Sequence, residues 1–304
     1  MKKKKIYSGL HTLPGGDAVE RVTPGCILLE GGSFRGLYTG GVLDRLMIEG
    51  INLQCTVGVS AGAMNGFNYV AGQIGRASRF NLSHRHDSNY VGWKALRKNK
   101  GIFGFDLVFD DARNNDPFHL ERFMRQDRRF VAVATDCITG QPAYLEKGIC
   151  GDMWHAIQAS ASMPIVSKMV MVENRPYLDG GCSVAIPLDW ALEQGFSKII
   201  VVRTRDRDYR KPEKPGKMEA IQKVLYHNYP QFLSALLESN ARYNVLCSRL
   251  EQLEKEGRIY VIAPSTPVTA GRLEKDMEKL GRLYWQGYEE TGRQIDRLRA
   301  ILSE

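Results

Sequence analysis

The chain has little of what a metal site or a disulfide framework requires. Its 304 residues include six cysteines and six histidines, and no two cysteines form a C-x-x-C pair. Metal sites need clustered ligands, so we expect no metal site here. Cysteines scattered in this way are typical of small buried side chains that stay reduced.

Long apolar runs are missing as well. No run approaches the roughly 18 residues that a membrane-spanning helix needs. The lysines at positions 2–5 are followed by a polar stretch rather than by the apolar core of a signal peptide. We therefore expect a cytoplasmic protein in which residues 1–24 form a flexible basic tail.

Acidic residues are scarce in residues 76–100 of this chain, whose net charge is +8. The segment has one acidic residue, Asp87, and the basic residues Arg76, Arg79, Arg85, Lys94, Arg97, Lys98 and Lys100, interleaved with Phe80, Tyr90 and Trp93. This composition suits an anionic lipid surface, and we expect peripheral contact with the inner membrane face. A solvated basic face without a partner remains open. Nucleic acid would suit the charge too, but no recognised nucleic-acid motif is present and we expect none.

Apolar runs alternate with helical patterns from about residue 25 to residue 205. Runs typical of buried strands lie at 26–30, 53–59, 130–135 and 198–203. Helical patterns cover 37–50, 61–71, 152–162 and 187–195. Strands that are apolar throughout and alternate with helices predict an α/β protein with a mostly parallel sheet covered on both faces.

The composition changes after residue 205. Residues 205–217 are polar, contain two prolines and predict a loop or linker. Helical patterns over 230–256 and 273–302 then flank a short strand-like run at 258–263. We expect three parts: the tail 1–24, an α/β domain 25–210 and a mainly helical C-terminal region 217–304.

Three motifs lie in the α/β domain. The first, Gly58-Val59-Ser60-Ala61-Gly62, is a G-x-S-x-G sequence where a strand-like run meets a helix-like run. A serine on such a sharp turn is pushed out of the sheet, and only small neighbours permit the turn. The other two are the glycine loop Gly31-Gly32-Ser33-Phe34-Arg35-Gly36 upstream and the triplet Asp179-Gly180-Gly181 downstream. G-x-S-x-G alone is common by chance, whereas the three motifs in this order are specific.

The motifs supply the parts that acyl transfer needs. Ser60 needs a base to take its proton. The glycine loop offers main-chain N–H groups for a developing oxyanion, and losing one such donor costs about 3–4 kcal/mol in hydrolases. Arg35 either stiffens this loop or binds an anionic head group.

Two choices of base remain open. A triad in the order Ser, Asp, His would have to end at His227, which is the only histidine after Asp179 and lies beyond the polar linker. A Ser60–Asp179 dyad needs no histidine, but burial would have to raise the pKa of Asp179. We favour the dyad.

At these motifs the chain resembles the patatin-like phospholipases, in the bacterial branch with an extra C-terminal helical region. That family carries a G-G-G-x-[KR]-G oxyanion loop, a G-x-S-x-G elbow and a D-G-[GA] triplet. Residues 159–164 (ASASMP) also resemble the family's segment ahead of the aspartate. The resemblance covers about residues 25–205.

The resemblance implies a three-layer α/β/α fold and hydrolysis of phospholipid, lysophospholipid or related acyl esters, without metal or cofactor. Ser60 would form the acyl-enzyme and Asp179 would act as base. The third loop glycine is replaced by Ser33, for which we expect a negative φ, since every other motif position is filled. The alternatives are a histidine-dependent α/β-hydrolase and a non-catalytic lipid-binding protein on the same fold. A nucleotide-binding loop is excluded because residues 31–36 match neither G-x-x-x-x-G-K-[ST] nor G-x-G-x-x-G.

Overall fold

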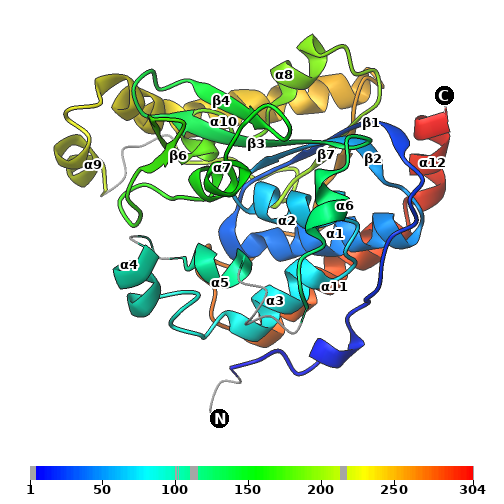
Figure 1. The fold of residues 1–304 in the computed structure, drawn as a ribbon. Coiled ribbons are helices and arrows are strands. Elements are labelled where there is room, and N and C mark those ends of the chain that lie inside the picture. Colours follow the sequence, from blue (N-terminus) through cyan, green and yellow to red (C-terminus); the bar gives the residue numbers. More distant parts are fainter. Residues whose placement is uncertain (1–4, 100, 102, 110–115, 213–217, 304) are drawn as a thin grey trace.

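A central sheet with helices on both faces forms the body of the protein (Figure 1). The structure is a computed structural model and describes residues 5–99, 101, 103–109, 116–212 and 218–303. The strands are β1 (Thr23–Leu29), β2 (Leu53–Val59), β3 (Arg129–Asp136), β4 (Pro142–Glu146), β5 (Val170–Val172), β6 (Arg175–Asp179), β7 (Ile199–Val202) and β8 (Tyr260–Ile262).

The strand order is β5-β6-β3-β2-β1-β7-β8, with β4 paired to β3. The pairs from β3 through β2, β1 and β7 to β8 are parallel, whereas β4, β5 and β6 pair antiparallel. The predicted mostly parallel sheet and the α/β fold class are therefore confirmed.

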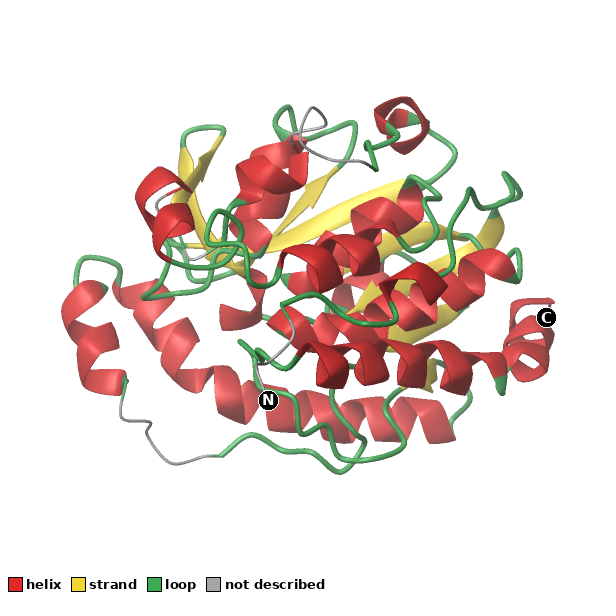
Figure 2. Ribbon diagram, turned by 90° about the horizontal axis from the view of Figure 1, so that it is seen from below, coloured by secondary structure: helices red, strands yellow, loops and turns green. Residues whose placement is uncertain are grey.

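Alternate residues of the central strand β1 point to opposite helical layers. Ile27 and Leu29 join the apolar cluster that contains α1, α11 and α12, while Cys26 and Leu28 join the cluster that contains α8 and α10. Figure 2 shows helices crossing one face of the sheet. The helices are α1 (Gly36–Ile48), α2 (Ala61–Val70), α3 (Arg76–His84), α4 (Trp93–Asn99), α5 (Phe105–Phe109), α6 (Leu120–Met124), α7 (Met153–Ser160), α8 (Leu188–Glu193), α9 (Glu219–Leu225), α10 (Pro230–Lys255), α11 (Met277–Gly292) and α12 (Ile295–Ser303).

The antiparallel hairpin β5–β6 is an element that the sequence patterns did not predict. Its strands are only three and five residues long, too short for a clear period. Its two turn residues, Glu173 and Asn174, both have positive φ, as in type I′ turns. This hairpin matters because β6 ends at Asp179.

The C-terminal region packs on the α/β part. Its strand β8 extends the sheet beside β7, and α11 lies along α1. Two buried hydrogen bonds join these helices, Tyr38 Oη to Glu290 Oε2 at 2.8 Å and Tyr284 Oη to Asp44 Oδ2 at 2.9 Å. The division at residues 210 and 217 stays a prediction.

The N-terminal segment differs from the flexible tail that we expected. Residues 1–4 lie outside the described residues, but residues 5–24 lie against the body. Ser8 Oγ donates to Glu278 Oε2 at 2.8 Å, and the amide of Ala18 donates to the carbonyl of Gly72 at 2.8 Å.

Much of the basic segment 76–100 is interior rather than surface. Arg76, Arg85, Phe80 and Tyr90 are all buried. Arg85 donates to the carbonyls of two residues in the C-terminal region, at 2.6 and 2.7 Å. Residues 76–100 therefore do not form one continuous basic face, because guanidinium groups of α3 and of the residue after it donate to buried main-chain oxygens. The basic side chains at 94, 97 and 98 are exposed.

Within the described residues, no helix combines the length and the apolar character that crossing a bilayer requires.

Candidate active site

Ser60 occupies a sharp turn between β2 and α2. It has φ 56° and ψ −120°, a conformation that L-residues rarely adopt. The turn brings α2 so close to β1 that a Cβ on Gly62 would clash with the carbonyl oxygen of Leu29. Gly58 is equally restricted, by the backbone of Ala63. The small residues predicted at this turn are thus required by close packing.

Asp179 lies at the end of β6, next to Ser60. Ser60 Oγ donates to Asp179 Oδ2 at 2.6 Å, and the amide of Gly181 donates to the other carboxylate oxygen at 2.8 Å. Both side chains are largely buried, since Ser60 is 7% and Asp179 8% exposed. A Cβ on Gly180 would clash with the carbonyl oxygen of Val133, so the triplet turns tightly over β3.

Strand β3 sets the distance between these two side chains. The last residue of β2, Val59, pairs with Val133, and the last residue of β6, Asp179, pairs with the next β3 residue, Ala134. The ends of β2 and β6 therefore meet at adjacent positions of one strand. This register brings together two residues that are 119 positions apart in the sequence.

Burial raises the pKa of Asp179 above its usual value, although the hydrogen bonds from Ser60 and Gly181 and the nearby cations Arg272 and Lys211 oppose this shift. A carboxylate with a raised pKa is a stronger base than one in water. The arrangement is therefore chemically capable of accepting the Ser60 proton.

The glycine loop lies beside the serine. An added Cβ on Gly31 would lie 3.0 Å from Ser60 Cβ, and one on Gly36 would lie 2.9 Å from Ala61 Cβ. On the described part of the chain, the amides of Gly31, Gly32 and Ser33 have no main-chain acceptor. They are free to bind an oxyanion, as is the first amide of α2, at Ala61.

Ser33 departs from our expectation of a negative φ, because its φ is 50°. Gly32 before it is extended at φ 175°, and Ser33 then begins the 3-10 turn Ser33–Arg35. Its hydroxyl faces Met163 Sδ at 3.5 Å. The motif's third glycine therefore marks a real left-handed position, and serine occupies it at a cost of about 1 kcal/mol or more.

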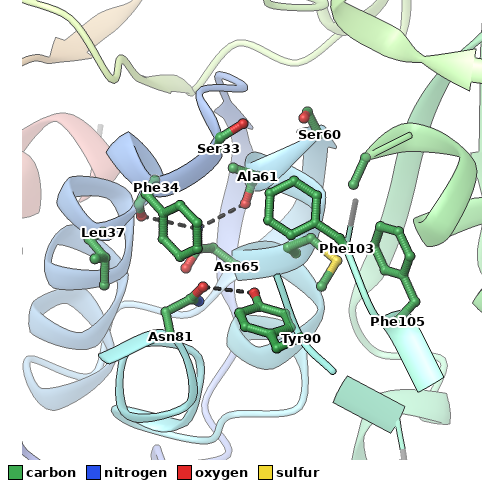
Figure 3. A pocket seen from close by; sticks show the side chains of 13 residues that line it. Ser33, Phe34, Leu37, Ser60, Ala61, Asn65, Asn81, Tyr90, Phe103 and Phe105 are labelled. Carbon is green, nitrogen blue, oxygen red and sulfur yellow. Dashed lines mark hydrogen bonds between the residues drawn. The ribbon is translucent and has the colours of Figure 1, made fainter. Parts of the chain in front are cut away.

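Two cavities meet at Ser33 and Ser60. The smaller, of about 50 Å³, is mostly apolar and is walled by rings of Phe34, Tyr90, Phe103 and Phe105. Figure 3 shows Ser33 and Ser60 at one end of it and Tyr90 at the other. The larger cavity, of about 620 Å³, contains Asp179, Gly181 and Arg35 in its wall. The side chain of Arg35 is thus part of this cavity and is buried.

Sequence reasoning missed Ser160. Its Oγ accepts from the amide of Ser60 at 2.9 Å and donates to the carbonyl of Val133 at 2.6 Å, which ties the elbow to β3. The segment ASASMP contains it, but nothing local to the sequence indicates this contact. The loop at 205–212, predicted only as a linker, also contributes Arg205 and Lys211 to the larger cavity.

His227, the alternative base, lies elsewhere. Its Nδ1 contacts the carbonyl of Val224 at 2.9 Å, its side chain is exposed, and it is absent from the described walls of both cavities.

Curated relatives that match the chain include the following two. The uncharacterized protein YjjU of Escherichia coli K12 is 29% identical over 189 residues, which cover 60% of this chain and 52% of the relative. Lysophospholipase nte1 of Aspergillus terreus is 25% identical over 297 residues, which cover 90% of this chain and 18% of that protein. The chain thus spans about half of the first relative and under a fifth of the second.

Among solved structures, VipD from Legionella pneumophila aligns over 98% of this chain and 72% of its own, with a TM-score of 0.49 and 13% identity. Two family models match separate segments. A domain of unknown function, DUF6363, matches residues 229–303, within the C-terminal region. The model described as patatin-like phospholipase matches residues 27–145, which hold the glycine loop and the Ser60 elbow. Residues 27–145 of this chain are therefore similar to the patatin-like phospholipases.

Proposed function

We propose that this protein hydrolyses acyl esters of phospholipids or lysophospholipids, with Ser60 as nucleophile and Asp179 as base. The match of residues 27–145 to the patatin-like phospholipase model supports lipid acyl hydrolysis in general terms. The name of the Aspergillus relative supports including lysophospholipids in the substrate class. The observation that carries the dyad is the 2.6 Å hydrogen bond from Ser60 Oγ to the buried Asp179 carboxylate.

In the first half-reaction, Ser60 Oγ attacks the ester carbonyl carbon and its proton passes to Asp179. The carbonyl oxygen gains the negative charge, and the loop amides of Gly32 and Ser33 with that of Ala61 stabilise it. When the tetrahedral intermediate collapses, the ester C–O bond breaks and the leaving alkoxide takes the proton from Asp179. An acyl group then remains on Ser60.

In the second half-reaction, a water molecule attacks the acyl carbon while Asp179 accepts its proton. Collapse of this intermediate releases the fatty acid and returns the proton to Ser60 Oγ. The carboxyl of Asp179 is protonated and deprotonated once in each half-reaction. Its raised pKa makes the protonated form easier to reach. No histidine takes part in either step, in keeping with the position of His227.

Covalent labelling with a fluorophosphonate probe tests this proposal. We expect the wild-type protein to be labelled and Ser60→Ala to be unlabelled. Asp179→Asn should label at least about a hundredfold more slowly, since general-base catalysis contributes factors of that size. Ser248→Ala, which removes an exposed serine on α10, is the matched control.

Two alternatives give different results in the same experiment. Loss of labelling in His227→Ala would favour a histidine-dependent hydrolase. An unlabelled wild-type protein that still binds lipid would favour the non-catalytic lipid-binding alternative, to which the strained Ser33 lends its support.

We also propose that the protein works in the cytoplasm and contacts the membrane peripherally through residues 76–100. The six cysteines are free thiols, as is usual in a reducing compartment. Within residues 76–100, the contact would rest on the exposed basic side chains of Lys94, Arg97 and Lys98 on α4.

A further inference from the structure

The larger cavity beside Ser60 carries four basic side chains that come from distant parts of the chain. One belongs to the glycine loop, two to the loop after β7, and one to the loop between β8 and α11. We call them the cationic cluster: Arg35, Arg205, Lys211 and Arg272. The mechanism proposed above uses none of these four side chains.

Arg35 is 7% exposed, and its Nε has no hydrogen-bond partner among the described residues. Burial, and then repulsion by Arg205 and Arg272, lowers the pKa of Arg35 to about 10. A buried guanidinium is costly unless an opposite charge and hydrogen bonds compensate it. This side chain is therefore placed to gain from an anion in the cavity.

Arg205 and Lys211 are held in place without being neutralised. Arg205 lies over the ring of Tyr209 at 4.3 Å and donates to a main-chain carbonyl, but its Nε is buried without a partner in the described structure. Lys211 Nζ lies 4.5 Å from the ring centre of Tyr243. Burial, and then the charge of Arg272, lowers the pKa of Lys211. Aromatic faces orient these cations but leave their charge available.

Arg272 is exposed at the mouth of the cavity. Its carbonyl accepts from the amide of Phe34 at 3.2 Å, which fixes this loop against the glycine loop. Arg85, which lies over the ring of Phe34 at 4.6 Å, donates to the carbonyls of the next two residues. The buried arginine after α3 thus positions an exposed arginine at the active site.

The carboxylates in the cavity wall already have other partners. Glu30 accepts from the amide and hydroxyl of Thr204, and Asp179 accepts from Ser60. The third, Glu219, pairs with Lys223 at 2.6 Å. Glu30 still acts by its charge on Arg35 and Lys211, and Asp179 acts by its charge on Lys211. The cavity wall holds the four cations of the cluster and three carboxylates, so its net charge is positive.

We propose that the cationic cluster binds the phosphate group of a net anionic acyl ester while the ester carbonyl lies at Ser60. The inference rests on the proposed lipid hydrolase function and narrows its substrate class. Guanidinium groups bind phosphate oxygens with paired, charge-assisted hydrogen bonds. The smaller, mostly apolar cavity also contains Ser60 in its wall. The acyl chain and the phosphate group of one substrate would therefore occupy different cavities.

Equilibrium binding to the full-length Ser60→Ala protein tests the cluster independently of turnover. Calorimetric titrations use 1-oleoyl lysophosphatidic acid, 1-oleoyl glycerol with the same chain, and inorganic phosphate, with both lipids in neutral detergent micelles. We expect the phosphate-bearing lipid to bind at least tenfold more tightly than the neutral one. Lys211→Gln and Arg272→Gln should each remove about tenfold of that affinity, the factor that 1.4 kcal/mol produces. Arg282→Gln, an exposed arginine on α11, is the matched control and should change affinity less than about twofold.

Three outcomes would overturn the proposal. The first is equal binding of the two lipids, and the second is variants of the cationic cluster that behave like Arg282→Gln. The third is inorganic phosphate that binds as tightly as the lysophosphatidic acid, which would make this a site for the free ion. Hydrolysis of p-nitrophenyl butyrate by the wild-type protein is measured in parallel. Its absence would contradict the proposed activity, whereas the binding result concerns the phosphate site alone.

Discussion

Ser60 and Ser33 both hold backbone conformations that cost an L-residue energy, with φ of 56° and 50°. The G-x-S-x-G pattern predicted a sharp turn at Ser60, whereas our expectation of a negative φ at Ser33 was wrong. Strain of about 1–3 kcal/mol per residue persists only where the surroundings enforce it. At Ser60 the enforcing contacts are the hydrogen bonds to Ser160 and Asp179. Such contacts form between distant segments, so a motif alone does not reveal them.

At the residue scale, we predict that activity falls with decreasing pH as Asp179 becomes protonated. Burial raises its pKa above 3.8, so the acidic limb of kcat/KM should lie above pH 3.8. A raised folded-state pKa means that the folded protein binds this proton more tightly than the unfolded chain does. Through this group, stability is highest below pH 3.8 and falls as the pH rises through the folded-state pKa. Activity and the contribution of Asp179 to stability therefore change in opposite directions.

The measurement is kcat/KM for an uncharged ester from pH 4 to pH 9, with urea unfolding at the same pH values. His227→Ala should keep the wild-type profile. An acidic limb of kcat/KM near pH 6.5 that is present in the wild-type protein and absent in His227→Ala would contradict Asp179 as the base.

Helix pairing at the element scale depends on small residues and buried polar groups. Gly41 of α1 and Gly287 of α11 let the helices approach so closely that a Cβ on either would clash with a carbonyl of the other helix. The helical periods of both segments were readable from the sequence. Their pairing was not, because 240 and 252 positions separate the residues of the two hydrogen bonds and no local pattern links them.

We predict that Asp44, at this helix pair, makes stability depend on pH. Burial raises its pKa to about 7, against hydrogen bonds from Gly75 and Tyr284. The folded protein thus binds this proton more tightly than the unfolded chain, so the contribution is complete below pH 3.8 and is lost as the pH rises through 7. Between pH 5 and pH 8 the free energy of unfolding should fall by roughly 2–3 kcal/mol through this group.

Urea unfolding at pH 5, 6.5 and 8 measures this contribution. Between pH 5 and pH 8, the free energy of unfolding of Asp44→Asn should fall by about 2–3 kcal/mol less than that of the wild-type protein. Asp296→Asn, which changes a fully exposed carboxylate on α12, is the control and should follow the wild type. Equal pH dependence of the Asp44→Asn and wild-type proteins would contradict the assignment.

For the whole molecule, the net charge of +8 does not reveal how the basic side chains are divided among the interior, the larger cavity and the surface. Some basic residues satisfy buried carbonyls, four form the cationic cluster, and others remain on the surface. The exposed group on α4 precedes Phe103 and Phe105, whose side chains line the smaller cavity.

We predict that reversing Arg97 and Lys98 to glutamate weakens binding to anionic vesicles by about tenfold or more, since each basic residue near such a surface contributes about 1 kcal/mol. Co-sedimentation with phosphatidylglycerol vesicles measures the effect. Reversal of Arg258 and Arg282, two exposed arginines outside α4 and the cationic cluster, is the charge-matched control. If both pairs of reversals weaken binding equally, the contact through α4 is excluded.

The sequence by itself determined the fold class, most of the strands and helices, and the three motifs, because alternating apolar runs and glycine-rich turns are local features. Only the tertiary structure decided how the motifs meet. The register of β2 and β6 on β3 sets Ser60 against Asp179, through a short hairpin with no clear period. The tertiary structure also places the polar loop after β7 and the loop between β8 and α11 in the wall of the same cavity. Such convergence depends on how distant segments pack together, and no window of neighbouring residues contains that information.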